Sequence, residues 1–320
     1  MQIDLNNKNI LFIAPIFYNY HEIIKAELER LGANVYFVPE RDYSFKFTIV
    51  NNFFPNKLEK LQANHYRAIC RKFDHIEFDY LFVIKGFKMS LEFLDLFKER
   101  YPAAIKIMHQ WDSEKNNPFS HLIDKFDRVF SFDYEDIAKY PNLVYLPNFY
   151  LSDIYLNDKY EYQYDILFLV SYLPERYHIM SKLQSFADKH QLKLKAILIM
   201  PFTTYVKDWF KGKRYDRSII KFSPLSRADY LALFWRSKII FDMGSSSQTG
   251  MSQRTIETIE SGKKLLTNNY YVKQDIIFNK DQIFVTSGEF SEEILDFMNS
   301  PFEVKPTGYS IEMWINKLFG

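Results

Sequence analysis

The sequence predicts an α/β fold in which two doubly wound parallel sheets form separate domains. Apolar runs of strand length alternate with amphipathic helical stretches along the whole chain, as in repeated β-α-β units. This alternation is interrupted once, by a polar, tyrosine-rich stretch over residues 147–162, and then restarts. With 320 residues the chain is long enough for two domains of ordinary size. We expect one domain over residues 1–150 and a second over residues 151–308.

The first half begins with a continuous apolar run over residues 10–15, typical of a strand buried on both faces of a parallel sheet. A helix follows over residues 21–31, and Gly32 ends it. The turn between them lacks the G-x-G-x-x-G of dinucleotide-binding oxidoreductases. Further strands are expected over residues 35–38, 79–84, 104–108, 128–132 and 144–146, with helices over 90–100 and 134–140.

Residues 43–73 are less regular, with several aromatic side chains leading into a helix that carries five basic residues. One interpretation is a core helix with a solvated basic face. The other is a surface that binds an acceptor or faces anionic lipid.

The second half restarts with a strand over residues 164–170 and a helix that ends near residue 190. Ser226 begins a capping box for a helix that ends at residue 237. Strands are also expected over residues 194–200, 219–222, 238–243, after Gly262 and within 276–285, and helices over 252–261 and 291–298. An amphipathic helix over residues 311–319, within a terminal segment 309–320, either packs back on the first domain or lies on the surface.

Composition excludes several classes of protein. The 41 basic and 40 acidic residues give a net charge of +1, so the chain lacks the excess of basic residues typical of nucleic-acid-binding proteins. We therefore expect no nucleic-acid partner. Cys70 is the only cysteine, which excludes an intrachain disulfide and a Cys-based metal cluster and favours a cytoplasmic protein. No window approaches the roughly 20 apolar residues of a membrane span. We therefore expect any membrane contact to be peripheral, at the cytoplasmic face of the inner membrane.

The stretch from residue 241 to residue 268 has the character of a binding site. A small polar loop, residues 244–250, connects an apolar strand to a helix, so the free N–H groups of Gln253, Arg254 and Thr255 would point at an anion such as phosphate. Glu257, about one turn further along the helix, would accept hydrogen bonds from ribose hydroxyls. The alternative is a solvated helix with a pair between Arg254 and Glu257 and a serine-rich surface loop.

The run R-T-I-E-T-I-E-S-G-K-K-L-L-T-N, residues 254–268, resembles the donor-site signature of GT-B glycosyltransferases, in particular bacterial cell-surface polysaccharide and CgeB-like enzymes. Glu257, Ser261 and Gly262 match the second half of that signature. Thr249 stands where the family has its first acidic residue, which leaves open the usual contact to the transferred sugar. The segment over residues 223–242 is similar to the approach to this site in GT-B enzymes.

The resemblance implies two Rossmann-like, doubly wound domains facing a central cleft, with a nucleotide-sugar donor on the second domain and a saccharide or glycolipid acceptor on the first. It also places Ser171 and Arg176 near the donor diphosphate, whereas an ordinary first-turn ion pair is the other interpretation of Arg176. The expected donor-binding residues are Ser171, Arg176, Gly244, Ser245, Ser246, Thr249, Gly250, Gln253, Arg254, Thr255 and Glu257.

Candidates for a general base come from the polar loop after the fourth expected strand, residues 109–118, because ligands bind beyond the carboxyl ends of such strands. We expect Asp112 to activate a sugar hydroxyl, with His109 and His21 as alternatives. Both residues also have a structural alternative: Asp112 could cap the turn, and His109 could be a packed residue at the end of the strand.

The function that follows from the resemblance is transfer of a sugar from a nucleotide-sugar to a saccharide or glycolipid in lipopolysaccharide or capsule synthesis. Asp-x-Asp is absent from the sequence, so we expect no metal, and no cofactor besides the nucleotide-sugar co-substrate. A nucleotide-sugar epimerase of the same fold and a non-catalytic nucleotide-sugar-binding scaffold remain as alternatives. The sequence decides neither the sugar nor whether the anomeric centre is inverted.

Overall fold

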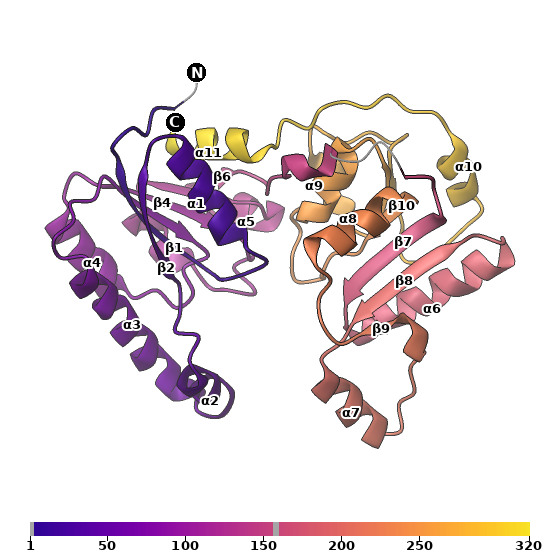
Figure 1. Ribbon diagram of the computed structural model, residues 1–320, viewed down its shortest axis with the longest axis horizontal. Helices are drawn as coiled ribbons and strands as arrows, with labels where there is room; N and C mark the ends of the chain where they lie inside the picture. Colours follow the sequence, from indigo (N-terminus) through magenta and orange to yellow (C-terminus); the bar gives the residue numbers. More distant parts are fainter. Residues whose placement is uncertain (1–2, 156–159) are drawn as a thin grey trace. The chain divides into compact units, whose positions relative to one another are not determined.

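The computed structural model describes residues 3–155 and 160–320, which form two compact units (Figure 1). Unit 1 comprises Met1–Asn148, Ser246–Gly250 and Ile311–Gly320, and unit 2 comprises Phe149–Ser245 and Met251–Ser310. The short segment Ser246–Gly250, which the sequence assigned to the second domain, thus groups with unit 1.

Unit 1 is built on a parallel six-stranded sheet of order β2-β1-β3-β4-β5-β6. Its strands are β1 (Asn9–Ala14), β2 (Asn34–Pro39), β3 (Tyr80–Ile84), β4 (Ile105–Gln110), β5 (Arg128–Ser131) and β6 (Val144–Tyr145). The helices are α1 (Tyr20–Arg30), α2 (Phe45–Phe53), α3 (Leu58–Lys72), α4 (Leu91–Arg100), α5 (Tyr134–Lys139) and α11 (Ile311–Phe319). Short 3-10 turns lie at Pro55–Lys57 and Ser120–Lys125.

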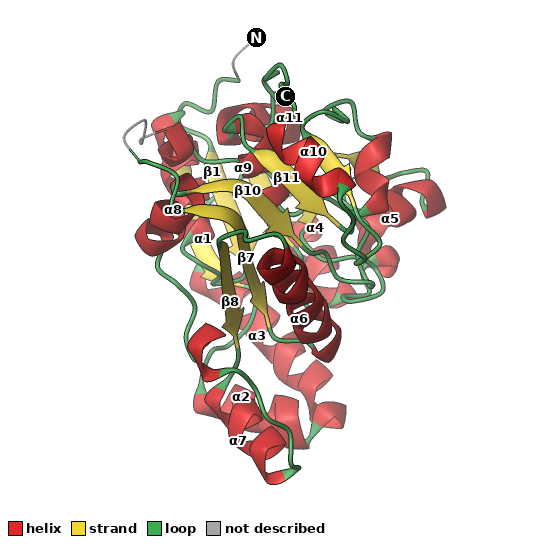
Figure 2. Cartoon of the chain, turned by 90° about the vertical axis from the view of Figure 1, so that its right-hand side faces the viewer, coloured by secondary structure: helices red, strands yellow, loops and turns green. Residues whose placement is uncertain are grey.

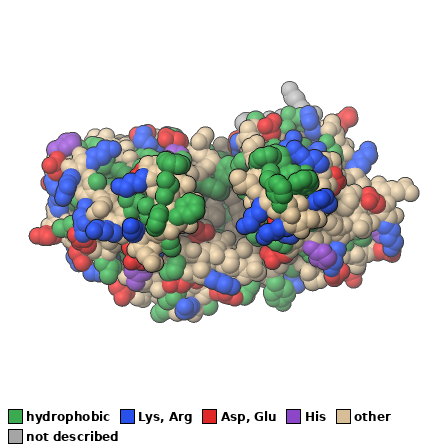
Figure 3. Space-filling view, turned by 90° about the horizontal axis from the view of Figure 1, so that it is seen from below, with side chains coloured by type: hydrophobic (Ala, Val, Ile, Leu, Met, Phe, Trp, Pro, Cys, Tyr) green, Lys and Arg blue, Asp and Glu red, His purple; other side chains and the backbone are tan. Residues whose placement is uncertain are grey.

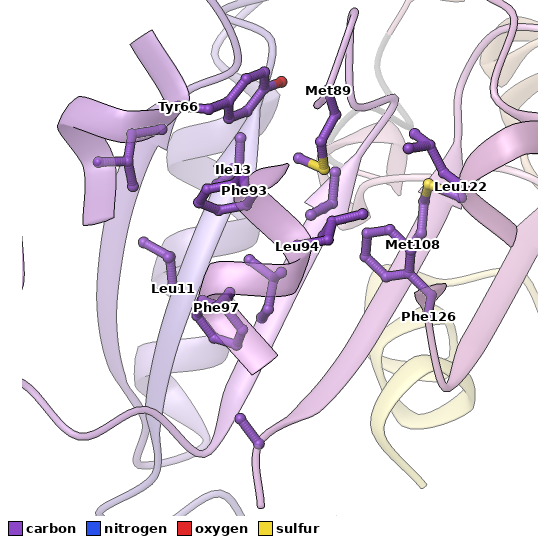
Figure 4. Packing of buried hydrophobic residues seen from close by; sticks show 14 of the residues in the cluster. Leu11, Ile13, Tyr66, Met89, Phe93, Leu94, Phe97, Met108, Leu122 and Phe126 are labelled. Carbon is purple, nitrogen blue, oxygen red and sulfur yellow. The ribbon is translucent and has the colours of Figure 1, made fainter. Parts of the chain in front are cut away.

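Alternate residues of each central strand cover opposite faces of this sheet, because side chains along a strand repeat every two residues. On one face, Leu11 and Ile13 of β1 pack with Phe93 and Phe97 of α4 in a continuous apolar core (Figure 4). On the other face, Phe82 of β3 contacts aromatic side chains of α11, with ring centroids 6.0 Å from Trp314 and 5.4 Å from Phe319. The terminal helix therefore closes the second face of the unit 1 sheet, beside α1.

Unit 2 repeats the design with a parallel six-stranded sheet of order β12-β11-β10-β7-β8-β9. Its strands are β7 (Tyr164–Ser171), β8 (Leu194–Ile199), β9 (Ile220–Lys221), β10 (Ser237–Asp242), β11 (Lys264–Thr267) and β12 (Ile283–Val285). The helices are α6 (Pro174–Lys189), α7 (Phe202–Phe210), α8 (Arg227–Trp235), α9 (Gln253–Glu260) and α10 (Glu293–Asn299). The 3-10 turns are Ser152–Tyr155, Arg217–Ile219 and Tyr270–Gln274.

Helices cover both faces of the unit 2 sheet, with α6 lying across one of them (Figure 2). Ile166 and Phe168 of β7 belong to the core beneath α6. The intervening Leu167 packs on the opposite face with Phe234 of α8. Two parallel sheets with flanking helices confirm the predicted pair of Rossmann-like, doubly wound folds.

Three elements differ from the sequence prediction. Only Ile283–Val285 of the run 276–285 forms a strand, since the chain before it takes turns. Two short helices, α2 and α7, were not expected, because the outward faces of both are aromatic and the amphipathic pattern is inverted. None of the helices formed by residues 3–155 and 160–320 combines the length and the apolar character of a membrane-spanning helix.

Candidate functional site

The strand, loop and helix predicted around residues 238–261 position the first candidate site, in unit 2. Strand β10 ends at Asp242 and α9 begins at Gln253. Ser252 caps this helix: its extended backbone (φ −68°, ψ 161°) aims the side-chain oxygen at Thr255 N, which donates at 3.1 Å. Because β7, β10 and β11 run parallel, the N-terminus of α9 lies at their carboxyl edge, where doubly wound sheets bind ligands.

A buried carboxylate of the protein already lies at this helix terminus. Asp242 accepts hydrogen bonds from Ser252 Oγ at 2.5 Å and Thr255 Oγ1 at 2.8 Å, and Arg254 Nη1 lies 3.2 Å from it. The Thr255 N–H that the sequence assigned to an anion is instead bonded to Ser252. Thr255 therefore supports Asp242 and the helix cap, and its two donors are not available to a phosphate.

The donors that remain at this edge come from two arginines and a glutamine. Arg176 Nε, Arg254 Nε and Gln253 Nε2 are buried and have no hydrogen-bond partner among the described residues. The guanidinium of Arg176 reaches the carbonyl oxygens of Ser171 (3.2 Å) and Met243 (3.4 Å), and that of Arg254 reaches Leu169 O (2.8 Å). These side-chain donors have the chemistry of an anion site.

The charges around the two guanidinium groups also favour an anion site at this edge. Burial lowers the pKa of Arg176, and the positive charge of Arg254 lowers it further. For Arg254, burial is the largest single effect and acts to lower the pKa, but Asp242, Tyr230 and Glu257 together outweigh it and raise the pKa above its usual value. Asp242 acts on both guanidinium groups, and a phosphate group at this edge would bring them further negative charge.

Glu257, expected on a ribose, lies in a different environment. It is 2% exposed, its Oε1 lies 2.8 Å from Arg227 Nη1, and its Oε2 accepts a hydrogen bond from Tyr230 OH at 3.2 Å. Arg227 in turn holds Asp153 through two hydrogen bonds, at 2.9 and 2.7 Å. Burial raises the pKa of Glu257, while Arg227 acts to lower it. Glu257 is thus part of an ion-pair network within unit 2, and its contact to a ribose stays a prediction.

The other residues carried over from the resemblance are spread along the same edge of unit 2. Ser171 is exposed at the end of β7 and Ser245 is half-buried after β10. Gly244 N donates to Asn268 Oδ1 at 2.8 Å, which fixes the start of the loop. An added Cβ at Gly244 would lie 3.7 Å from its nearest neighbour, so the glycine is not required by a close contact within the protein.

Residues Ser246–Gly250, between Ser245 and Met251 along the chain, group with unit 1. Thr249 N donates to Asp133 Oδ2 at 2.7 Å, and Thr249 Oγ1 accepts from Glu135 N at 3.2 Å. An added Cβ at Gly250 would lie only 2.2 Å from the ring of Phe132. Close packing on unit 1, which sequence spacing does not show, thus accounts for Thr249 and Gly250, whereas Ser246 is exposed. The donor contacts expected of these three residues stay predictions.

The second candidate site lies at the carboxyl edge of the unit 1 sheet, around Asp112. One oxygen of Asp112 lies 2.6 Å from Lys85 Nζ, and the other accepts a hydrogen bond from Gln248 Nε2 at 2.9 Å. The Asp112 side chain is 27% exposed, so it remains within reach of a ligand. It does not act as the cap of a helix in the structure, and its role as a general base stays a prediction.

Sequence reasoning missed Glu40, which follows β2 at the same edge. Glu40 is 2% exposed and accepts a hydrogen bond from Phe87 N at 3.0 Å. Burial raises its pKa to about 7, against the opposing charge of Lys85, while Asp112 raises it further. A carboxyl group that changes charge near neutral pH beside another carboxylate is typical of functional sites. The available signal was a lone glutamate directly after an apolar strand.

The turn that carries Lys85 is held in an unusual backbone conformation. Lys85 has φ of 68° and Gly86 has φ of 65°, in the left-handed region that side chains disfavour. Gln110 Nε2 and Asn117 Nδ2 both donate to Lys85 O, at 3.2 and 3.1 Å. Buried side chains thus fix the lysine beside Asp112, and backbone strain of this kind concentrates at functional sites.

The two histidines proposed as alternative bases are placed differently. His109 is fully buried in unit 1, with Nε2 3.0 Å from Leu146 O and 3.2 Å from Trp314 Nε1. Burial lowers its pKa to about 3, and its structural role as a packed strand-end residue fits better than general-base catalysis. His21 is 7% exposed in α1 and packs on Phe37, with ring centroids 4.8 Å apart, which does not fit contact with an acceptor.

Each unit therefore has one cluster of charged side chains at the carboxyl edge of its sheet. The unit 2 cluster has two guanidinium groups with unpartnered buried donors and suits a diphosphate. The unit 1 cluster combines two carboxylates with a lysine and suits proton transfer. Within the part of the chain that the structure describes, no group of three or more His, Cys, Asp or Glu side chains is placed to hold a metal ion.

No protein-family model matches the sequence, and a search of curated proteins finds no match. Solved structures do match. The chain is similar to the UDP-GlcNAc 2-epimerase of Methanocaldococcus jannaschii in complex with UDP-GlcNAc and UDP (TM-score 0.58, 10% identity, 96% of this chain and 98% of that chain). It is similar in the same degree to the UDP-GlcNAc 2-epimerase of Neisseria meningitidis bound to UDP-GlcNAc (TM-score 0.58, 10% identity, 97% of each chain).

A third match is MurG of Acinetobacter baumannii, with a TM-score of 0.48, 11% identity and coverage of 97% of this chain and 94% of that chain. At identities this low, likeness to solved structures shows the fold alone. The matches extend over nearly the whole length of each protein, and the chain has the two-domain GT-B fold that its sequence predicts.

Proposed function

We propose that the protein is a glycosyltransferase that moves a sugar from a nucleotide-sugar donor to a saccharide or glycolipid acceptor in cell-surface polysaccharide synthesis. The observation that carries the proposal is the cationic cluster of Arg176 and Arg254 at the N-terminus of α9, with its unpartnered buried donors. The solved structures with the same fold include proteins named for UDP-GlcNAc, which supports a nucleotide-sugar as the ligand.

The donor diphosphate would bind at this cluster in unit 2. As the bond between the sugar C1 and the diphosphate oxygen breaks, negative charge develops on the leaving group, and the fixed guanidinium groups lower the barrier. The acceptor hydroxyl forms the new bond to C1 and loses its proton. In an inverting reaction Asp112 would take that proton, since its side chain is partly exposed and is held by Lys85 and Gln248.

A glycolipid acceptor would bring the protein to the inner membrane. Unit 1 supports such a contact through α2, where Phe45 is 79% and Phe53 73% exposed. Lys46 lies next to Phe45, and Lys57 and Lys60 follow α2 along the chain. Aromatic side chains flanked by basic ones support a surface contact at α2. The helix that follows, α3, fits the core-helix interpretation, because Tyr66 and Ile69 lie in the unit 1 core while its basic side chains are exposed.

A thermal-shift panel of nucleoside diphosphates and their sugars tests the donor site. A ligand present at about 100 times its Kd should stabilise the folded protein by about 2.7 kcal/mol. Arg176→Gln should abolish the shift, because it removes one cation of the cluster. Lys189→Gln is the matched control: it removes a positive charge from the other end of α6, where the side chain is exposed, and should leave the shift unchanged. A panel without any shift, or a shift that survives Arg176→Gln, would refute the donor site.

An epimerase of the same fold is the second candidate function. Both matched structures with a TM-score of 0.58 are named as UDP-GlcNAc 2-epimerases, and the second carboxyl group at the unit 1 edge, Glu40, adds a proton-transfer group that an inverting transferase does not need. Incubation with the nucleotide-sugar alone separates the two functions. An epimer formed without acceptor establishes the epimerase, whereas donor that is consumed only when an acceptor is added establishes the transferase.

A further inference from the structure

Helix α7 of unit 2 presents large aromatic side chains to solvent. Phe202, Trp209 and Phe210 are 59%, 49% and 76% exposed. Together with Val206 they occupy positions i, i+4, i+7 and i+8, which form a single stripe along a helix. Figure 3 shows the corresponding apolar cluster, with basic side chains around it, on the face of unit 2 that carries α7. The amphipathic pattern of α7 is thus inverted relative to a helix that covers a core.

The opposite side of α7 is fixed to unit 2, so the aromatic stripe points outward as a stable feature. Asp208, 6% exposed, accepts hydrogen bonds from Tyr172 OH at 2.9 Å, Tyr215 OH at 2.5 Å and Lys213 Nζ at 3.1 Å. The hydrogen bond from Tyr215 is the largest of the effects that lower the pKa of Asp208 to about 2, so this anchor stays ionised at neutral pH. Tyr205 also packs inward on Phe222, with ring centroids 5.4 Å apart.

The charge around the stripe is strongly positive. Residues 201–221 contain six basic and only two acidic residues, in a chain whose net charge is +1. One of the two acids, Asp208, is the buried anchor. Exposed basic side chains border the aromatic ones. The guanidinium of Arg214 lies over the ring of Trp209, 5.4 Å from its centroid, within the reach of about 6 Å of a cation–π contact.

We propose that this α7 surface, formed by Phe202, Lys207, Trp209, Phe210, Lys211 and Arg214, binds the anionic phospholipid surface of a membrane. An outward apolar stripe bordered by lysine and arginine is the pattern of helices that lie in the interface plane, with the rings among the upper acyl chains and the cations at the phosphates. The proposal concerns unit 2 and rests on its own observations, so it stands or falls independently of sugar transfer.

The α7 surface fits a second copy of the chain or a nucleic acid less well than a lipid surface. In a symmetric dimer through α7, the surface would face its own copy, and the lysines of one chain would meet those of the other. A nucleic acid would suit the cations. However, Phe210, the most exposed aromatic side chain of the α7 surface, packs against Trp209 with ring centroids 5.1 Å apart and is not a separate stacking platform. A lipid surface uses the apolar cluster and the cations together.

Vesicle flotation of the full-length protein tests the proposal. The vesicles are phosphatidylcholine alone and phosphatidylcholine mixed in equal parts with phosphatidylglycerol. We expect binding to the mixed vesicles only, weakened by salt, and a loss of about tenfold or more in the partition coefficient for Phe210→Ser and for the double variant Lys207→Glu/Lys211→Glu. Ile276→Ser is the matched control, because Ile276 is 91% exposed in the same unit outside the α7 surface; this variant should bind like the wild type.

Tryptophan fluorescence gives a second measurement that does not depend on flotation. A blue shift of the emission on adding mixed vesicles should disappear in Trp209→Phe, and the melting temperatures of all variants should match the wild type, since the altered side chains are exposed. Failure to bind mixed vesicles, or binding that Phe210→Ser leaves unchanged, would overturn the proposal. A concentration-dependent dimer abolished by Phe210→Ser, or binding to an RNA oligonucleotide in place of vesicles, would overturn it as well.

Discussion

The raised pKa of Glu40 makes the stability of unit 1 depend on pH in a defined way. Glu40 is 2% exposed, and burial raises its pKa from 4.5 to about 7. The informative change is Glu40→Gln, because glutamine has almost the same shape and retains a carbonyl oxygen that can accept the hydrogen bond from Phe87 N. The variant differs from the wild type mainly in lacking a titrating group.

The magnitude follows from the two pKa values. Between about pH 4.5 and pH 7 the folded protein holds the Glu40 proton and the unfolded chain does not, so raising the pH through this window favours unfolding. The protonated Glu40 side chain contributes to the free energy of unfolding. This contribution is fully present below about pH 4.5 and is lost as the pH rises through about 7. A difference of about 2.5 pKa units, at about 1.4 kcal/mol per unit, corresponds to a loss of about 3 kcal/mol.

We therefore expect Glu40→Gln to gain about 2 to 3 kcal/mol of stability relative to the wild type between about pH 5 and pH 8. A constant effect of the amide on packing cancels in this comparison. Hydrogen exchange in urea, read on peptides from β1 and β3, measures the unfolding of unit 1 separately from unit 2. Glu59→Gln serves as the control, since the Glu59 side chain is 83% exposed. Stability curves of wild type and Glu40→Gln that run parallel over this pH range would refute the reasoning.

Two further predictions concern the loop and helix around residues 242–255. Arg254→Leu should destabilise unit 2 by about 2 to 4 kcal/mol, because it leaves the buried carboxylate of Asp242 without the cation that contacts it. The double variant with Asp242→Asn should recover part of this loss of stability. Equal urea midpoints for wild type and Arg254→Leu would contradict this prediction. Gly250→Ala should cost unit 1 about 1 to 3 kcal/mol, because the new Cβ would lie 2.2 Å from the Phe132 ring. Gly244→Ala, whose Cβ has room, should be close to neutral in the same assay, and an equally stable Gly250→Ala would show that this packing is not tight.

Much of the fold could be predicted because its signals are local. The run over residues 10–15 is apolar at every position, and β1 at Asn9–Ala14 is buried almost throughout, so strand length and burial follow from the residues themselves. Ser226 and Ser252 were expected to begin helices, and both side chains accept a hydrogen bond from the N–H three residues on. Helices α2 and α7 escaped prediction because a sequence pattern shows an amphipathic face without showing which side of it meets the core.

The candidate site was harder to predict because its residues contact side chains that are distant in sequence. Glu257 was expected on a ribose from its spacing to Arg254, but a cation 30 positions away in sequence, Arg227, binds it in the structure. His109 was a candidate base until Trp314, from the far end of the chain, was found against it. Glu40 showed no motif at all, and only its burial beside Lys85 and Asp112 makes it notable.

Thr249 shows how one departure from a family signature can have a structural cause. Its N–H and its hydroxyl oxygen both bond to the start of α5, through Asp133 and Glu135 N. Asp133 is 1% exposed and already accepts the N–H groups of Glu135 and Asp136 as the helix cap. An acidic side chain at position 249 would bring a second negative charge against this buried carboxylate, whereas threonine satisfies the helix terminus without charge. In this chain position 249 therefore serves the packing of unit 1, while its contact to the transferred sugar stays a prediction.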